Sequence, residues 1–201
     1  MADHASSMVW AERWSAMDDQ AKLGRLLAAQ DWAGAERVLK RMAGAKGAGA
    51  PVFYNLGKVL FEQGRFRPAA TWLEKAARAA PGHANAWFEL GRARLELGEL
   101  EPARAAFAEA LRLDPRDEDA RRNAGRLALR LGRFAEARAA WEALAGDGEA
   151  DIALYRVAAE TRDPQAARLR VAILARRDIR AAAIKALVRV SKGAVPLDLG
   201  G

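Results

Sequence analysis

A period of 34 residues runs through most of the chain, and it constrains the fold more than any other feature. Three columns of small residues follow this step: Gly57, Gly91 and Gly125; Gly64, Gly98 and Gly132; and Ala35, Ala69, Ala103 and Ala137. Two apolar columns follow the same step: Trp32, Phe66, Leu100 and Phe134; and Leu39, Leu73, Phe107 and Trp141. Such self-similarity indicates a stacked array, in which each unit buries its apolar face against its neighbours.

Each unit is predicted to be a helical hairpin. In the copy 84–117, the first helical pattern ends at Gly98, the second has Pro102 in its first turn, and Pro115 closes it. A proline is tolerated in the first turn of a helix, and the residue before a proline avoids the α conformation. The two helices are expected to approach closely where Gly91 faces Ala103, because larger side chains would force their backbones apart.

The spacing W-x2-L-G, then A-x3-F-x2-A, then P resembles the tetratricopeptide repeat (TPR). In the copy 84–117 it consists of Trp87, Leu90, Gly91, Ala103, Phe107, Ala110 and Pro115. The copies 50–83 and 118–151 match in part, and 16–49 is degenerate because Gly24 is one position out of step. The resemblance implies an all-α fold, a right-handed superhelical solenoid of four helix-turn-helix hairpins over 16–151 with capping helices at both ends.

Both ends depart from the repeat. Residues 1–15 are expected to form an N-terminal capping helix, with Trp10, Trp14 and Met17 on one face, packing against the core rather than binding a partner. After residue 151 the 34-residue step fails, and about three further helices are predicted in 152–192, with starts at Asp163 and Asp178. Residues 193–201 are expected to be a tail or a linker.

Charge also separates the two parts of the chain. Residues 1–151 hold 23 basic and 22 acidic side chains, whereas 152–192 hold 10 basic and 3 acidic ones. The predicted basic C-terminal surface consists of Arg176, Arg177, Arg180, Lys185 and Arg189. It either caps the solenoid with a solvated face or binds an acidic partner such as nucleic acid, anionic lipid or protein. A single aromatic residue, Tyr155, argues against a stacking platform for nucleic acid and against membrane insertion.

The sequence offers no set of residues for catalysis. It has no cysteine and only two histidines, His4 and His83, so neither a thiolate site nor a three-histidine metal site is possible. No phosphate-binding loop, nucleophile elbow or zinc-protease motif occurs. We therefore expect no enzyme activity, no metal and no cofactor.

In the TPR family the first helices of successive hairpins line a concave groove that holds extended peptides or partner helices. The corresponding positions here are Tyr54, Lys58 and Phe61; Phe88, Arg92 and Leu95; and Arg122, Arg126, Leu129 and Arg130. Lys58, Arg92 and Arg126 share one column, which suits an acidic peptide or a chain-terminal carboxylate. Acidic neighbours, Glu62, Glu89 and Glu96, are close enough in sequence to neutralise some of this charge. Tyr54 and Lys58 differ from the usual Lys and Asn of chaperone-binding TPR proteins, so a chaperone tail is not predicted.

The resulting prediction is a bacterial adaptor or scaffold that binds a protein or peptide partner. Two alternatives remain: the N-terminal, acceptor-selecting module of a larger enzyme such as a bacterial protein glycosyltransferase, and nucleic-acid binding through the basic block. The gene sequence beyond Gly201 decides the first of these.

The N-terminus lacks the pattern of a signal peptide and no apolar run is long enough to cross a bilayer, so a cytoplasmic location without a membrane span is expected. The sequence sets no oligomeric state.

Overall fold

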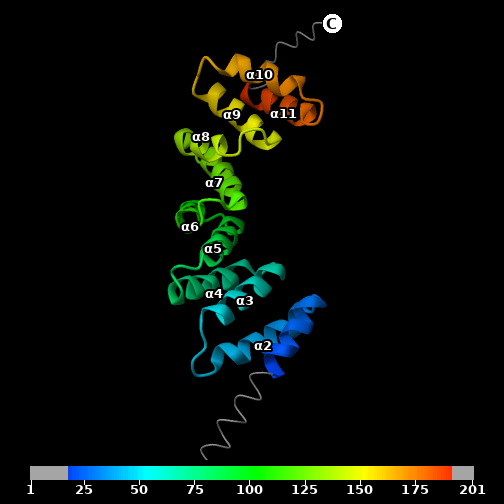
Figure 1. Ribbon diagram of the computed structural model, residues 1–201, viewed down its shortest axis with the longest axis vertical. Helices are drawn as coiled ribbons and strands as arrows, with labels where there is room; N and C mark the ends of the chain where they lie inside the picture. Colours follow the sequence, from blue (N-terminus) through cyan, green and yellow to red (C-terminus); the bar gives the residue numbers. More distant parts are fainter. Residues whose placement is uncertain (1–17, 192–201) are drawn as a thin grey trace, which may run out of the picture. The chain divides into compact units, whose positions relative to one another are not determined.

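The computed structural model describes residues 18–191, and this part of the chain is built from helices and turns without a strand (Figure 1). The all-α prediction is therefore confirmed for these residues. The chain divides after Pro115 into two compact units, which we call unit 1 and unit 2 and describe separately. The predicted capping face of Trp10, Trp14 and Met17 and the segment 193–201 lie outside the described residues.

Unit 1 consists of successive helical hairpins. A helical segment over 18–28 is followed by α2 (Trp32–Gly44), α3 (Ala50–Glu62), α4 (Phe66–Ala79), α5 (Ala84–Glu96) and α6 (Leu100–Leu113). Each helix packs against the next one along the chain, α2 on α3, α3 on α4, α4 on α5 and α5 on α6. Helices α3 and α4, and likewise α5 and α6, thus form two successive hairpins.

The turn inside each hairpin depends on a residue in the left-handed conformation. Gly64 and Gly98 have φ angles of 71° and 72°, a region that glycine enters without steric cost. Gln30 takes the same position in the degenerate first copy, with a φ of 54°. The first copy therefore keeps the turn of the repeat although it has lost the glycine.

A second glycine column makes room for the largest side chains of the hairpins. A Cβ atom placed on Gly91 would lie 2.7 Å from the ring of Phe107, and one on Gly57 would lie 2.5 Å from the Leu73 side chain. The close approach predicted at Gly91 is confirmed, but the three nearest atoms all belong to Phe107 and not to Ala103. The glycine column therefore accommodates a side chain on the facing helix.

Unit 2 continues the pattern of packed helices. It contains α7 (Glu118–Arg130), α8 (Phe134–Glu142), α9 (Gly148–Glu160), α10 (Ala166–Ala175) and α11 (Arg180–Val190). Helix α9 packs against α8, α10 and α11, and it runs through residue 151, where the sequence placed the end of the last repeat. Helices α9 and α10 thus form a further hairpin beyond the four that were predicted.

This further hairpin follows a shorter step because α8 is shorter than its counterpart α6. The distance along the chain from the start of α8 to the start of α9 is about one helical turn less than that from α6 to α7. The shortened step relates Asp117 to Asp147, which cap the N-termini of α7 and α9. It also relates Gly132, the turn glycine of the preceding hairpin, to Arg162, which has a φ of 56°. The repeat therefore shifts in register at this point and does not stop.

Two helix starts predicted in the basic block are displaced toward the C-terminus. Helix α10 begins at Ala166 and α11 at Arg180, shortly after the predicted caps Asp163 and Asp178. The carboxylate of Asp163 accepts a hydrogen bond from the Gln165 backbone N–H at 2.9 Å, which forms a turn before the helix starts. Asp and Asn side chains compete with helix formation in this way.

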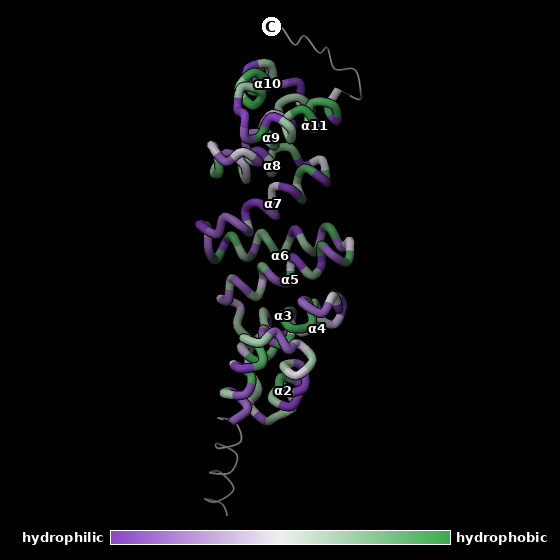
Figure 2. Tube along the Cα trace, turned by 90° about the vertical axis from the view of Figure 1, so that its right-hand side faces the viewer, coloured by the Kyte–Doolittle hydropathy of each residue, from purple (hydrophilic) through white to green (hydrophobic). Residues whose placement is uncertain are grey.

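The helices are amphipathic, and hydrophobic and hydrophilic positions alternate along the tube in Figure 2. The apolar faces form separate cores in the two units. In unit 1 the fully buried side chains include Leu39, Leu56, Leu60, Leu73, Leu90 and Phe107. In unit 2 they include Leu127, Trp141, Val157 and Ile173. Helices of this kind are stabilised mainly by burying an apolar face against their neighbours.

Glu36 is expected to make the stability of unit 1 depend on acidic pH. Its carboxylate lies 2.8 Å from Lys40 Nζ and 2.7 Å from Arg65 Nη1. The hydrogen bond from Lys40, opposed by burial and supported by Arg65, lowers the pKa of Glu36 to about 2. Because an unfolded glutamate titrates near pH ~4.3, the stabilisation is complete above about pH 5 and is lost as the pH falls toward 2.

Glu36→Gln is accordingly expected to lower the free energy of unfolding by about 1–2 kcal/mol at pH 7, and by much less near pH 2. Urea unfolding at both pH values measures this difference. Glu62→Gln is the control, because Glu62 is an exposed glutamate of the same unit with no ion pair among residues 18–191. An equal loss for Glu36→Gln at both pH values would contradict this role of the carboxylate.

Candidate functional site

Unit 1 brings most of its predicted groove residues together on two helices. Tyr54, Lys58 and Phe61 lie on α3, at positions i, i+4 and i+7, and therefore on one helical face. Phe88 and Arg92 lie on one face of α5, which contacts α3. We call these five residues, together with Glu89, the unit-1 cluster.

Glu89 is the centre of the cluster. It is only 6% exposed, yet it is a carboxylate, and a buried charge is tolerated only when it is paired. Its Oε1 lies 3.4 Å from Lys58 Nζ, and its Oε2 accepts a hydrogen bond from Arg92 Nη1 at 2.9 Å. Two cations thus share one carboxylate, and the cluster keeps an excess of one positive charge.

Aromatic rings hold both cations in place. The guanidinium of Arg92 lies 4.4 Å from the ring centre of Phe61 and 5.9 Å from that of Phe88. Lys58 Nζ lies 5.7 Å from the ring centre of Tyr54. A cation over an aromatic face gains about 0.5–1 kcal/mol at an exposed site. The side chains of Lys58 and Arg92 remain 42% and 37% exposed, so a ligand can reach them.

Electrostatics keep Lys58 charged. Burial opposes its protonated form, but attraction and hydrogen bonding to Glu89, with a contribution from Tyr54, outweigh this effect and raise the pKa of Lys58. Burial is also the main reason why the pKa of Tyr54 is raised, so this phenol stays neutral at physiological pH. Leu95, the remaining predicted groove residue of unit 1, lies half-buried on α5.

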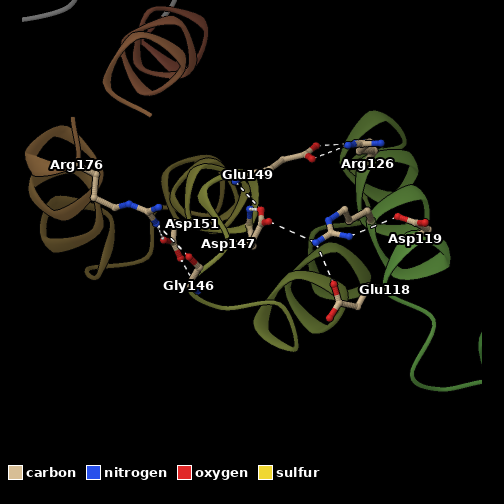
Figure 3. Close-up of polar contacts among 10 residues, drawn as sticks. Glu118, Asp119, Arg126, Gly146, Asp147, Glu149, Asp151 and Arg176 are labelled. Carbon is tan, nitrogen blue, oxygen red and sulfur yellow. Dashed lines mark hydrogen bonds and ion pairs between the residues drawn. The ribbon is translucent and has the colours of Figure 1, made fainter. Parts of the chain in front are cut away.

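In unit 2 the predicted groove arginines pair with carboxylates. Arg126 donates two hydrogen bonds to Glu149 on α9, at 2.6 and 2.5 Å (Figure 3). Arg122 lies 3.1 Å from Glu118, 3.5 Å from Asp119 and 3.4 Å from Asp147. These contacts join α7 to the beginning of α9 and balance both positive charges. Arg130 is exposed and has no ion pair within the described part of the chain.

The five predicted basic residues of the C-terminal block have different surroundings. Arg176 donates to Asp151 at 2.6 Å and to the Gly146 carbonyl at 3.2 Å (Figure 3). It also donates to Asp178 at 2.7 Å. Arg180 donates to the carbonyl of Leu174 at 2.9 Å, near the end of α10. The other three, Arg177, Lys185 and Arg189, are exposed and without ion pairs between residues 18 and 191.

Sequence reasoning missed one basic residue, Arg156 on α9. It follows Arg126 by the same shortened step that relates Asp117 to Asp147, so it continues the column of Lys58, Arg92 and Arg126. Its side chain is half-buried and lines a pocket of unit 2. The signal was present in the sequence as the pair Asp117 and Asp147, whose spacing reveals the shift in register.

Within residues 18–191, no three histidine, cysteine or acidic side chains lie close enough together to hold a metal ion. None of the helices described there has the length and apolar character required to cross a bilayer.

Comparison with known proteins agrees with the helical hairpins. A family model described as tetratricopeptide repeat matches residues 22–84, 54–118 and 88–151. A search of curated proteins gave no significant match.

Solved structures share the fold at low sequence identity. The chain is similar to YrrB, described as a TPR protein with an unusual peptide-binding site, with a TM-score of 0.73 and 19% identity over 82% of this chain and 87% of that one. A structure of MamA is similar with a TM-score of 0.69 and 19% identity, over 93% of this chain and 97% of the MamA chain. The chain is also similar to the second TPR domain of human RPAP3, which was solved in complex with the HSP70 peptide SGPTIEEVD. The TM-score is 0.54 and the identity 20%, over 57% of this chain and 96% of that domain.

Proposed function

Since the chain belongs to the tetratricopeptide repeat family, we propose that it is a protein-interaction module that binds an extended, acidic segment of a partner protein at the unit-1 cluster. The observation that carries this proposal is the sharing of the Glu89 carboxylate by Lys58 and Arg92. A partner carboxylate would supply the second negative charge that these two cations lack.

The composition of the cluster favours a peptide over a lone anion. Tyr54, Phe61 and Phe88 provide apolar contact area beside the two cations, and rings already oriented by Lys58 and Arg92 need little further ordering. Extended segments bind such surfaces through a few anchoring side chains, and arginine forms strong charge-assisted hydrogen bonds with carboxylates. An acidic residue next to an apolar one is therefore the segment that best fits.

The similar structures support this reading. YrrB is described as having a peptide-binding site, and the RPAP3 domain was solved with a peptide, SGPTIEEVD, that contains three acidic residues. Our proposal places the main acid-binding charge at Lys58 and Arg92. It assigns Arg122 and Arg126 a structural role, because Asp147 and Glu149 already balance them. The cytoplasmic location, the absence of enzyme activity and the larger-enzyme alternative stay predictions from the sequence.

The proposal is tested with an array of decapeptides, each carrying two acidic residues and one aromatic or aliphatic residue. A matched array replaces every Asp with Asn and every Glu with Gln. We expect the full chain to bind the best acidic peptides at least about tenfold more tightly than their amide counterparts, because a charged hydrogen bond contributes roughly 1.5–3 kcal/mol. Binding should also weaken as salt is added. Equal binding to both arrays at low salt would overturn the proposal.

A further inference from the structure

Unit 2 contains a pocket lined by a half-buried arginine, Arg156, that has no ion-pair or hydrogen-bond partner within the described part of the chain. The pocket has a volume of about 360 Å³ and lies among α7, α8, α9 and the beginning of α11. Its apolar walls include Leu129, Trp141, Ile152 and Ile179. Its charged residues are Arg126, Glu149 and Arg156. All of these residues belong to unit 2, so the pocket is complete within this unit.

The two arginines of the pocket differ in their pairing. Arg126 forms a two-fold hydrogen-bonded ion pair with Glu149, so its charge is balanced. Arg156 has no ion pair or hydrogen-bond acceptor among residues 18–191, and its Nε atom is buried without a partner. Burial, followed by repulsion from Arg189, lowers the pKa of Arg156, although Glu160 attracts it. An unpaired, partly buried cation is energetically unfavourable, so binding one negative charge beside Arg156 would stabilise this pocket.

The indole of Trp141 forms part of the apolar wall, and its N–H lies against Gly125 of α7, out of reach of a ligand. Trp141 is 1% exposed and its indole N–H has no acceptor in the described part of the chain. The unpaired guanidinium of Arg156 donates hydrogen bonds and cannot accept one. A ligand must therefore bring acceptor oxygens and a negative charge, while the apolar walls require that the rest of it be apolar.

We propose that this pocket binds a single carboxylate carried on an apolar body of the size of a short acyl chain or a leucine side chain. One unpaired cation matches one negative charge, whereas a phosphate carries up to two. The volume is at the lower end of that of small-molecule sites, which are mostly apolar with a few placed polar groups. The carboxylate belongs either to a free organic acid or to the last residue of a peptide. This site is independent of the unit-1 cluster.

Three probes separate the two halves of the ligand. Hexanoate carries both the charge and the apolar body, hexanamide lacks the charge, and acetate lacks the body. We expect the full chain to bind hexanoate, to bind the other two at least about tenfold more weakly, and to shift the indole N–H resonance of Trp141 in ¹H–¹⁵N NMR spectra. A peptide that ends in leucine, with a free or an amidated terminus, tests the second source. If the peptide with a free terminus binds more tightly than hexanoate, the natural ligand is the C-terminal end of a peptide chain. If hexanoate binds and the peptide does not, the natural ligand is a free organic acid.

Two substitutions assign the charge. Arg156→Gln is expected to weaken hexanoate binding at least about tenfold, and Arg130→Gln, an exposed arginine of α7, to leave it unchanged. Replacing an arginine that stabilises the fold would lower the midpoint temperature of thermal unfolding. Removing the unpaired, half-buried charge of Arg156 should instead leave this temperature unchanged or raise it. Equal binding of hexanoate and hexanamide, or wild-type hexanoate affinity of Arg156→Gln, would overturn the proposal. Neither result bears on the comparison of acidic and amide peptides in the two arrays, which differ only in their side-chain carboxylates.

Discussion

Gly91→Val is expected to lower the free energy of unfolding of unit 1 by about 3 kcal/mol or more, from overpacking against the next helix. Even a Cβ atom at this position would lie 2.7 Å from the ring of Phe107, which is fully buried. Gly91→Ala should produce a smaller loss, of about 1–2 kcal/mol, since the higher helix propensity of alanine offsets part of the strain. Equilibrium urea unfolding measures both changes.

Gly24→Ala is the matched control for this substitution. Gly24 also lies within a helix, but a Cβ atom there would meet no other atom within 4 Å. The same chemical change should therefore raise the stability by about 0.5–1 kcal/mol, through helix propensity alone. Opposite signs at the two glycines are expected, and a gain in stability at Gly91 would contradict the packing of Phe107 in this column.

Charge reversal at Arg92 is expected to have the largest effect on ligand binding. Arg92→Glu places a carboxylate where the acidic peptide should bind, and we expect the affinity for the best acidic decapeptide of the array to fall about thirtyfold or more. Arg126→Glu makes the same change at the same repeat position of unit 2. It should weaken binding by less than about threefold, because Glu149 already balances that arginine. Isothermal titration calorimetry with both variants measures the contrast.

Glu89→Gln provides the converse change. It removes the only carboxylate that Lys58 and Arg92 share in the described structure, so acidic peptides should bind more tightly while the unit loses some stability. Far-UV circular dichroism and urea unfolding establish that each variant is folded before binding is compared. Equal losses for Arg92→Glu and Arg126→Glu would mean that the acid-binding charge is not confined to unit 1.

The repeated columns were readable in the sequence because they serve packing, which recurs in every hairpin. Gly64 and Gly98 mark the turns, and Gly57 and Gly91 mark the contacts with Leu73 and Phe107. Such positions impose the same steric demand at each step. The helical hairpins followed from that regularity. The resemblance to the tetratricopeptide repeat implied the fold class and the grouping of Tyr54, Lys58, Phe61, Phe88 and Arg92.

The ion pairs of unit 2 could not be predicted from the sequence, because they depend on the number of residues between the starts of successive helices. Helix α8 is shorter than α6, so α9 begins about one turn early and brings Glu149 and Asp147 to Arg126 and Arg122. A fixed repeat step cannot place these acids. The same shift conceals Arg156 as the continuation of the column that contains Arg126. Glu89 could be suspected as a neutralising group, but its burial between two cations required the structure.

The central claim is that a carboxylate of the bound segment meets the cations of the unit-1 cluster. A double-mutant cycle measures this contact directly, by combining Arg92→Gln in the protein with Glu→Gln at each acidic position of the best decapeptide. We expect a coupling energy of at least about 1 kcal/mol at one acidic position and close to zero at the others. Coupling below about 0.3 kcal/mol at every acidic position would contradict the account, even if the peptide binds tightly.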